Sequence, residues 1–134
     1  MADTPRRSEF LSPLRVEDCG DGKYEKLLEN LRYYSARFRC VFVVLAGFRS
    51  DGLSSPRFSW FIYPKRGGKY RRPAWLHDAP YQGALYAETE TGELVRVRLI
   101  REFADALFHE AMEAEGVKSD DFLTWIVSRF GGGR

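Results

Sequence analysis

The chain has 134 residues, with 21 basic and 19 acidic side chains, so its formal net charge is only +2. This length suits one domain, residues 1–134, with a sizeable core. A hydrophobic fraction of 44%, with 15% aromatic residues, excludes wholesale disorder. Because the charges nearly balance, the net charge does not indicate binding to nucleic acid or to a membrane. Cys19 and Cys40 provide neither a disulfide framework nor zinc-ligand spacing.

The N-terminal half predicts an arm followed by strands. Residues 1–22 are interrupted by prolines and glycines and are expected to form an extended, irregular arm. Residues 23–31 fit either a helix or a strand. Residues 32–48 are rich in aromatic and β-branched side chains and predict a strand. The loop that follows, residues 47–57, contains Asp51.

From Pro73 the pattern turns helical, since proline suits a first helical position. Pro80 conflicts with this helix, because an interior proline costs about 3 kcal/mol. Either the helix starts late, near Leu76, or it bends just after His77-Asp78.

Residues 84–99 predict a β-hairpin with its turn at Thr91-Gly92. In its second strand Val95, Val97 and Leu99 alternate with arginines, which predicts a half-buried strand.

Residues 100–115 give the clearest helix. Phe103, Leu107, Ala111 and Ala114 recur at helical spacing, and Gly116 provides a stop signal. A last helix is expected over residues 119–130. The predicted fold is α+β: a small antiparallel sheet from the N-terminal half packs on two or three C-terminal helices, with an inserted hairpin near 84–99.

The stretch His77-Asp78-Ala79-Pro80-Tyr81 carries the strongest chemical signal. On a helix, His77 and Tyr81 share a face while Asp78 points about 100° away. A carboxylate from another helix would orient the imidazole, and Asp105 fits because it lies beside the apolar stripe of the 100–115 helix. The other imidazole nitrogen would then take a proton from water.

Each of these residues also has a plainer interpretation. Asp51 precedes a glycine and suits a turn. Asp105 is one helical turn from Arg101, a pairing worth only about 0.3–0.5 kcal/mol on a surface. His109, one turn after Asp105, would be a metal ligand or solvated helix surface. The three tryptophans suit the core.

The ordered set of motifs resembles a small phage and prophage family called domain of unknown function 1353. The resemblance covers about residues 38–130. It rests on the segment Gly47 to Arg57, on Trp75-Leu76-His77-Asp78 with Tyr81, on Arg101 with Ala104-Asp105 and Phe108, and on Ala111-Met112 with Gly116-Val117. Ser50 stands where threonine is usual, which keeps the hydroxyl. The resemblance implies a phage or prophage origin and brings no established activity.

A more distant likeness is to secreted and parvoviral phospholipases A2, through His-Asp-x-x-Tyr followed by Ala-Asp on a later helix. That likeness implies His77 as the base, Asp78 as a calcium ligand and Asp105 as the residue that orients His77. The glycine-rich calcium loop of those enzymes has no clear match, so Asp51 would have to provide the second ligand.

Three functions follow as hypotheses. The first is a metal-assisted hydrolase, with His77 and Asp105 catalytic and Asp78 and Asp51 binding a divalent cation, calcium or zinc. The second is a virion or assembly component, of the tail or head–tail region, that contacts other phage structural proteins and uses the same residues as a structural polar network. The third is a nucleic-acid-binding accessory protein using the basic run 65–72, against which the near-neutral charge argues. With no signal peptide and no transmembrane run in the sequence, the predicted location is the virion or the host cytoplasm.

Overall fold

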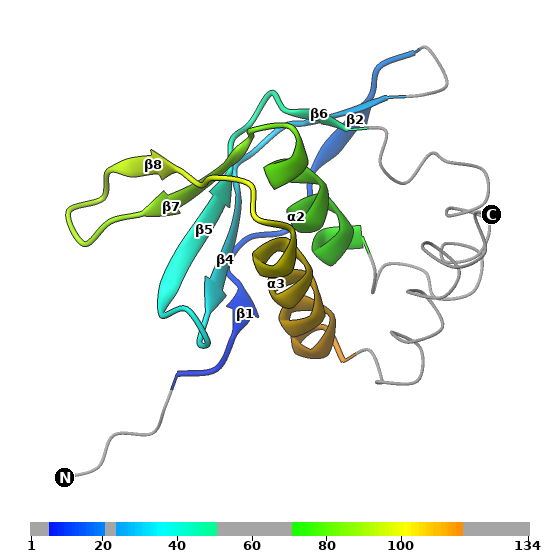
Figure 1. The fold of residues 1–134 in the computed structure, drawn as a ribbon. Coiled ribbons are helices and arrows are strands. Elements are labelled where there is room, and N and C mark those ends of the chain that lie inside the picture. Colours follow the sequence, from blue (N-terminus) through cyan, green and yellow to red (C-terminus); the bar gives the residue numbers. More distant parts are fainter. Residues whose placement is uncertain (1–5, 21–23, 51–70, 117–134) are drawn as a thin grey trace, which may run out of the picture.

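A computed structural model describes residues 6–20, 24–50 and 71–116 of the chain (Figure 1). Within these residues the structure is a mixed α+β fold, as the sequence predicts. It contains a five-stranded antiparallel sheet, a second sheet of three strands and two helices. The helix predicted for residues 119–130 lies outside the described residues.

The five-stranded sheet is built from both halves of the chain. Its strands, in spatial order, are β1 (Glu9–Phe10), β4 (Leu31–Ser35), β5 (Cys40–Val44), β7 (Leu85–Glu88) and β8 (Leu94–Arg96). The predicted hairpin is present as β7 and β8, and Gly92 in its turn has φ +88°, a region that glycine enters without strain. It is not an insertion beside the sheet, however, because β7 pairs with β5. The prediction of a sheet from the N-terminal half was therefore incomplete.

The second sheet corrects the prediction of an irregular N-terminal arm. It consists of β2 (Val16–Asp18), β3 (Glu25–Leu27) and β6 (Arg49–Ser50). Residues 6–20 thus contribute β1 to one sheet and β2 to the other. The propensity of so short a strand is weak, and its pairing partners lie elsewhere in the sequence.

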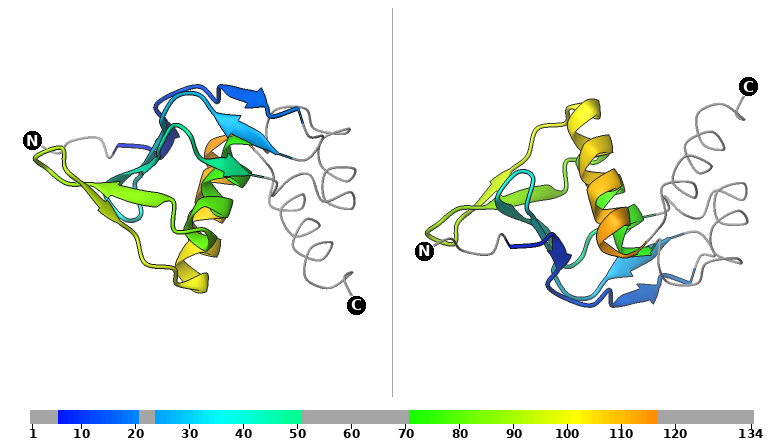
Figure 2. Two further views of the ribbon diagram at one scale, coloured as in Figure 1. Left: turned by 90° about the horizontal axis from the view of Figure 1, so that it is seen from above. Right: turned by 90° about the horizontal axis from the view of Figure 1, so that it is seen from below.

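Both helices contribute side chains to the hydrophobic core with the main sheet. Figure 2 shows the two helices side by side. The helices are α2 (Arg71–Tyr81) and α3 (Arg101–Ala114), and they contact each other along their length. Leu76 of α2 and Leu107 of α3 are completely buried. The core cluster also contains, from β4, β5, β7 and α2, Leu31, Tyr33, Phe42, Val44, Leu85 and Trp75. Trp75 is a core residue as expected, whereas Trp60 and Trp125 lie outside the described residues.

Pro80 does not delay the start of α2, and it lies one residue before the end of the helix. The helix begins at Arg71, two residues before Pro73, so it does not start late near Leu76. Pro80 lies in the last turn, where Ala79 O accepts hydrogen bonds from Gln82 N and Ala84 N at 3.0 and 2.9 Å. Pro80 has no N–H to donate to Leu76 O, so the missing helical bond falls in the last turn, and the helix ends one residue later at Tyr81.

Two details of the predicted burial were wrong. On α3 the buried stripe includes Ala104, Leu107 and Ala111, but Ala114 is exposed. The second hairpin strand is mostly exposed, because all three residues of β8 and also Leu99 are exposed, and of the predicted apolar face Val97 alone packs, partly buried, against the core. Alternation in the sequence reveals which side chains share a face, but the neighbouring elements decide whether that face is covered.

Candidate functional site

His77 and Asp105 connect the two helices through a hydrogen bond, as the sequence analysis expected. His77 Nε2 lies 3.0 Å from Asp105 Oδ1. The helical spacing of α2 directs His77 towards α3, and Asp105 borders the buried stripe of α3. When Nε2 carries its proton, it donates this hydrogen bond to the carboxylate.

The imidazole of His77 lies between two aromatic rings. Its centroid is 5.2 Å from that of Tyr81 and 4.8 Å from that of Phe108. Tyr81 is one helical turn beyond His77, so the predicted shared face is present. The two rings restrict the orientation of the imidazole, which fixes the nitrogen that faces Asp105.

The two members of this pair differ sharply in exposure. The His77 side chain is 3% exposed, whereas that of Asp105 is 44% exposed. Asp105 is therefore the member that meets solvent, and His77 is the buried member that holds it in place. This division differs from the expected one, in which His77 meets water and Asp105 orients it.

Asp78 points away from His77 and contacts a different part of the fold. Its Oδ2 accepts a hydrogen bond from Ser50 Oγ at 2.5 Å and another from Gln82 Nε2 at 3.0 Å. Because adjacent helical residues point about 100° apart, His77 connects α2 to α3 while Asp78 connects α2 to β6. The sequence analysis missed Ser50 and Gln82 as partners. Ser50 carries the hydroxyl of the Gly47–Arg57 motif, and that hydroxyl was the available signal.

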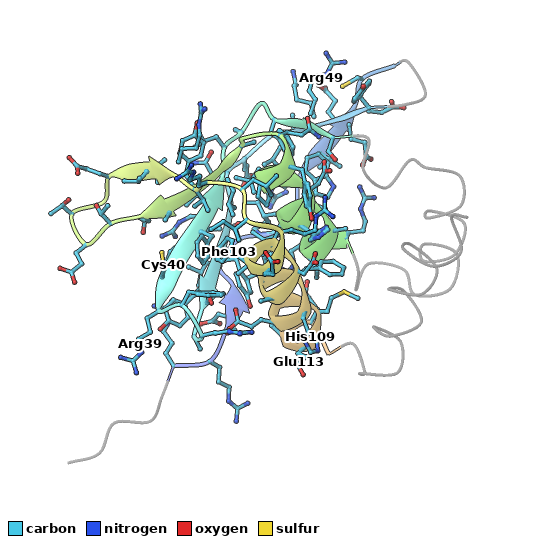
Figure 3. The ribbon with its side chains drawn as sticks, in the orientation of Figure 1. Arg39, Cys40, Arg49, Phe103, His109 and Glu113 are labelled. Atoms are coloured by element: carbon cyan, nitrogen blue, oxygen red, sulfur yellow. The ribbon has the colours of Figure 1, made fainter. Side chains whose placement is uncertain are left out.

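The remaining metal-site residues do not converge within the described part of the chain. Asp51 lies outside it. His109 Nε2 is 3.8 Å from Glu113 Oε2, and Figure 3 shows both side chains near the same end of α3. Residues 6–20, 24–50 and 71–116 contain no group of three or more His, Cys, Asp and Glu that could hold a metal ion.

Neither cysteine has a feature that marks it as an activated nucleophile. Cys19 and Cys40 are both free thiols. Burial raises the pKa of the Cys40 thiol, and a thiol with a raised pKa stays protonated at neutral pH. Cys40 lies at the start of β5 on the main sheet (Figure 3).

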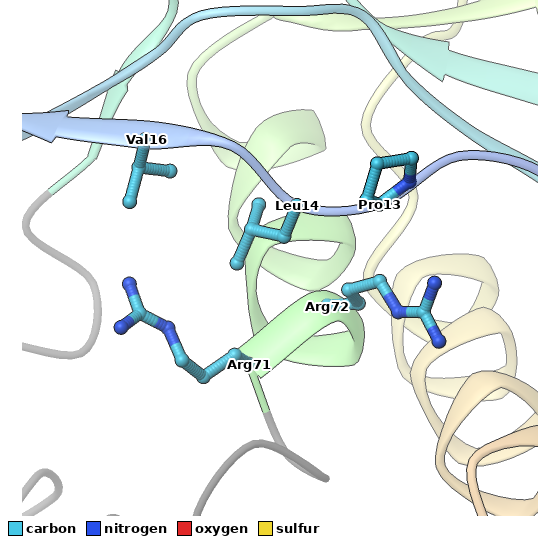
Figure 4. A pocket seen from close by; sticks show the side chains of 5 residues that line it. All are labelled: Pro13, Leu14, Val16, Arg71 and Arg72. Atoms are coloured by element: carbon cyan, nitrogen blue, oxygen red, sulfur yellow. The ribbon is translucent and has the colours of Figure 1, made fainter.

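A pocket of about 340 Å³ lies at the start of α2, apart from the His77–Asp105 pair (Figure 4). It is lined by Pro13, Leu14, Val16, Arg71 and Arg72. Its arginines already have carboxylate partners: Arg71 Nη2 is 2.6 Å from Glu25 Oε1, and Arg72 binds Glu115 through two bonds of 2.6 and 2.8 Å. These glutamates offset the positive charge, so the pocket is not a strong anion site. The Arg72–Glu115 pair connects α2 to the residue that ends α3.

A partly buried polar contact between β4 and α3 was also missed by the sequence analysis. The Tyr33 hydroxyl donates a 2.7 Å hydrogen bond to Glu110 Oε1, and Arg37 N donates one of 2.9 Å to Glu110 Oε2. Burial, followed by the bond to Glu110, raises the pKa of Tyr33 above its ordinary value. This contact connects β4 to α3, and nothing in the local sequence around Tyr33 or Glu110 predicts it.

Within the described residues, the fold and site define an α+β protein in which helices α2 and α3 are joined by a histidine–carboxylate pair. Residues 25–126 match the family model described as protein of unknown function (DUF1353), and the chain belongs to that family. The match starts before the span of residues 38–130 on which the resemblance rested. Neither a curated protein nor a solved structure matches the chain.

Proposed function

We propose that the chain is a hydrolase in which the His77–Asp105 pair exchanges a proton with the attacking water. The observation that carries the proposal is the 3.0 Å contact between a buried imidazole and a solvent-facing carboxylate on two different helices. A histidine–carboxylate pair of this kind is a common acid–base device.

The exposure of the two side chains sets their roles in this proposal. Asp105 meets water and accepts its proton, while the water oxygen forms a bond to the electrophilic centre of the substrate. The leaving group departs with the electron pair of the bond that breaks and receives the proton. His77 donates its Nε2 hydrogen bond to Asp105 and keeps one carboxylate orientation. The assignment made from the sequence, with His77 as the base and Asp105 orienting it, uses the same hydrogen bond with the two roles exchanged.

A divalent cation remains part of the proposal through the carboxylates predicted for it. Asp78 and Asp51 are the predicted ligands of calcium or zinc, and hard cations prefer such oxygen donors. Asp78 Oδ2 is already engaged by Ser50 and Gln82, so a cation would have to bind Oδ1 or displace these donors.

The proposal is tested by assaying the purified chain on one substrate of each hydrolytic class: a nitrophenyl carboxylic ester, a nitrophenyl phosphodiester, a phospholipid vesicle and a casein digest. Each assay is run with EDTA, with calcium and with zinc. We expect Asp105→Asn to lower kcat about 100-fold or more, and His77→Gln to lower it as well.

Glu113→Gln is the matched control, since it makes the same change from carboxylate to amide on the same helix, where the Glu113 side chain is 59% exposed. It should leave kcat unchanged. Thermal unfolding of each variant separates loss of activity from loss of fold. The proposal fails if no class is turned over, or if Asp105→Asn turns over substrate as fast as wild type.

A second candidate function is a structural role in a larger assembly, such as the tail or head–tail region of a phage particle. The specific observation in its favour is the burial of His77 between Tyr81 and Phe108, which suits a polar contact that fixes the fold. The phage or prophage origin remains a prediction of the resemblance. Mass spectrometry of purified particles from a strain that carries the gene tests this role, since absence of the chain from the particles contradicts it.

A further inference from the structure

The β7–β8 hairpin extends away from both helices, and β8 forms one edge of the main sheet (Figure 1). A row of paired residues shows how the burial of side chains on the sheet decreases towards this edge. From Phe10 it passes through Tyr33, Phe42 and Ala87 to Val95. Tyr33 is fully buried, whereas Val95 is 54% exposed. The helices therefore cover this face of the sheet near β4 and leave it open at β8.

Among the residues that the structure describes, the backbone of β8 has hydrogen-bonding groups without a partner at its outer edge. Glu93 O accepts a bond from Thr89 N, and Val97 N donates one to Leu85 O, both at 2.8 Å. In an antiparallel pair alternate residues bond to the same neighbour. The odd-numbered residues of this segment therefore face β7, and the N–H and C=O groups of Leu94 and Arg96 face outwards.

The side chains of this edge are apolar or basic. Residues 94–101 contain three arginines, Arg96, Arg98 and Arg101, and no acidic residue. Within the described part of the chain, none of these arginines has an ion-pair partner. The same segment contains apolar side chains that are 39% to 54% exposed: Leu94, Val95, Leu99 and Ile100.

We propose that the β8 edge binds an acidic, extended segment of a partner protein, which adds to the main sheet as a sixth strand. The outward N–H and C=O groups of Leu94 and Arg96 supply backbone hydrogen bonds to the incoming strand. Arg96 and Arg98, two residues apart, favour carboxylates at every second position of that strand. Val95 and Leu99 favour apolar residues at the alternate positions.

The charge of the edge decides between this partner and a second copy of the chain. Pairing β8 with the β8 of another copy brings Arg96 and Arg98 close to the same arginines of that copy, and like charges across a strand pair are destabilising. A partner with carboxylates turns the same contacts into attraction. The inference does not depend on whether the His77–Asp105 pair is catalytic.

The test uses the full chain and a synthetic peptide of about seven residues in which glutamate alternates with valine. Binding is followed by amide hydrogen exchange, measured residue by residue by NMR. We expect saturation with the peptide to slow exchange of the Leu94 and Arg96 N–H groups about 10-fold or more. The Val97 N–H, already bonded to Leu85, should change little.

Two variants examine the role of charge. Arg96→Glu should weaken binding of the acidic peptide about 10-fold, since it replaces attraction with repulsion. Arg39→Glu is the matched control, because Arg39 is an exposed arginine at the β4–β5 turn, away from β8 (Figure 3). It makes the same change in net charge and should leave the affinity for the acidic peptide within about twofold of that of the wild type.

Three outcomes overturn the proposal. One is the absence of peptide binding at millimolar concentration. Another is equal binding of a scrambled acidic peptide without slower exchange at Leu94 and Arg96, which indicates adsorption by charge alone. The third is binding to phosphatidylglycerol vesicles that is lost in Arg96→Glu while the peptide does not bind, which assigns the edge to an anionic membrane surface.

Discussion

The α2–α3 interface and the β7–β8 hairpin use similar residue types in opposite ways. At the interface, polar and charged groups are paired across elements: Arg72 with Glu115, and His77 with Asp105. On the hairpin, Arg96 has no ion-pair partner within the described residues, and the apolar Val95 is exposed. The comparison teaches that the interface is organised to hold the fold together, whereas the hairpin edge has the unmet bonding capacity of a binding surface.

The largest expected effect is on the free energy of unfolding, and the same substitution should change it by different amounts in the two regions. Leu107→Ala removes a completely buried side chain of the core and should lower the free energy of unfolding by about 2–5 kcal/mol. Leu94→Ala makes the same change on exposed β8 and should alter it by less than about 0.5 kcal/mol. Urea unfolding followed by circular dichroism measures both. Equal losses would mean that β8 is as much part of the core as α3.

A smaller effect is expected from the ion pair that joins α2 to the end of α3. Arg72→Lys loses the two-bond contact with Glu115 and the bond to Ser12 O, and should cost about 1–2 kcal/mol. Arg15→Lys alters the exposed pair with Glu29, where the cost should stay below about 0.5 kcal/mol. Urea unfolding at low and at high salt measures the free energy of unfolding of both variants. A loss at Arg15 as large as that at Arg72 would contradict the distinction between the two pairs.

The buried Tyr33 should make stability depend on alkaline pH. Its folded-state pKa lies above the unfolded value of about 10, so its contribution is fully present below pH 10 and is lost as pH rises above it. By pH 11 the loss should reach about 1 kcal/mol. Tyr33→Phe should remove this part of the alkaline loss. Tyr34→Phe, on the opposite face of β4, is the control, and urea unfolding at pH 8 and pH 11 measures the difference. An unchanged alkaline loss in Tyr33→Phe would refute the assignment.

The smallest expected effect concerns the hairpin arginines. Arg96→Gln and Arg98→Gln should each change the free energy of unfolding by less than about 0.5 kcal/mol, because neither side chain has an ion-pair partner among the described residues. Thermal unfolding checks this. A loss above 1 kcal/mol would show that these arginines stabilise the fold, which removes the contrast with the interface.

Local signals in the sequence predicted the elements that depend on short spacing. The period of Leu107 and Ala111 predicted α3, and Thr91-Gly92 predicted the turn between β7 and β8. The contact between His77 and Asp105 was also anticipated, because a carboxylate from another helix was expected to orient His77 and Asp105 lies beside the buried stripe of α3. These inferences succeed since helical period and turn chemistry are local properties.

Only the tertiary structure decided which groups are covered and which meet solvent. The short strands β1 and β2 form because partners far along the chain pair with them, which local propensity does not encode. Likewise, Val95 and Tyr33 belong to one row of the sheet, and their burial differs because the helices cover one end of it. The sequence by itself determined the α+β class, the helix α3, the turn between β7 and β8 and the residues that could bond. Long-range packing determined that His77 is buried, that Asp105 faces water and that the β8 edge is open.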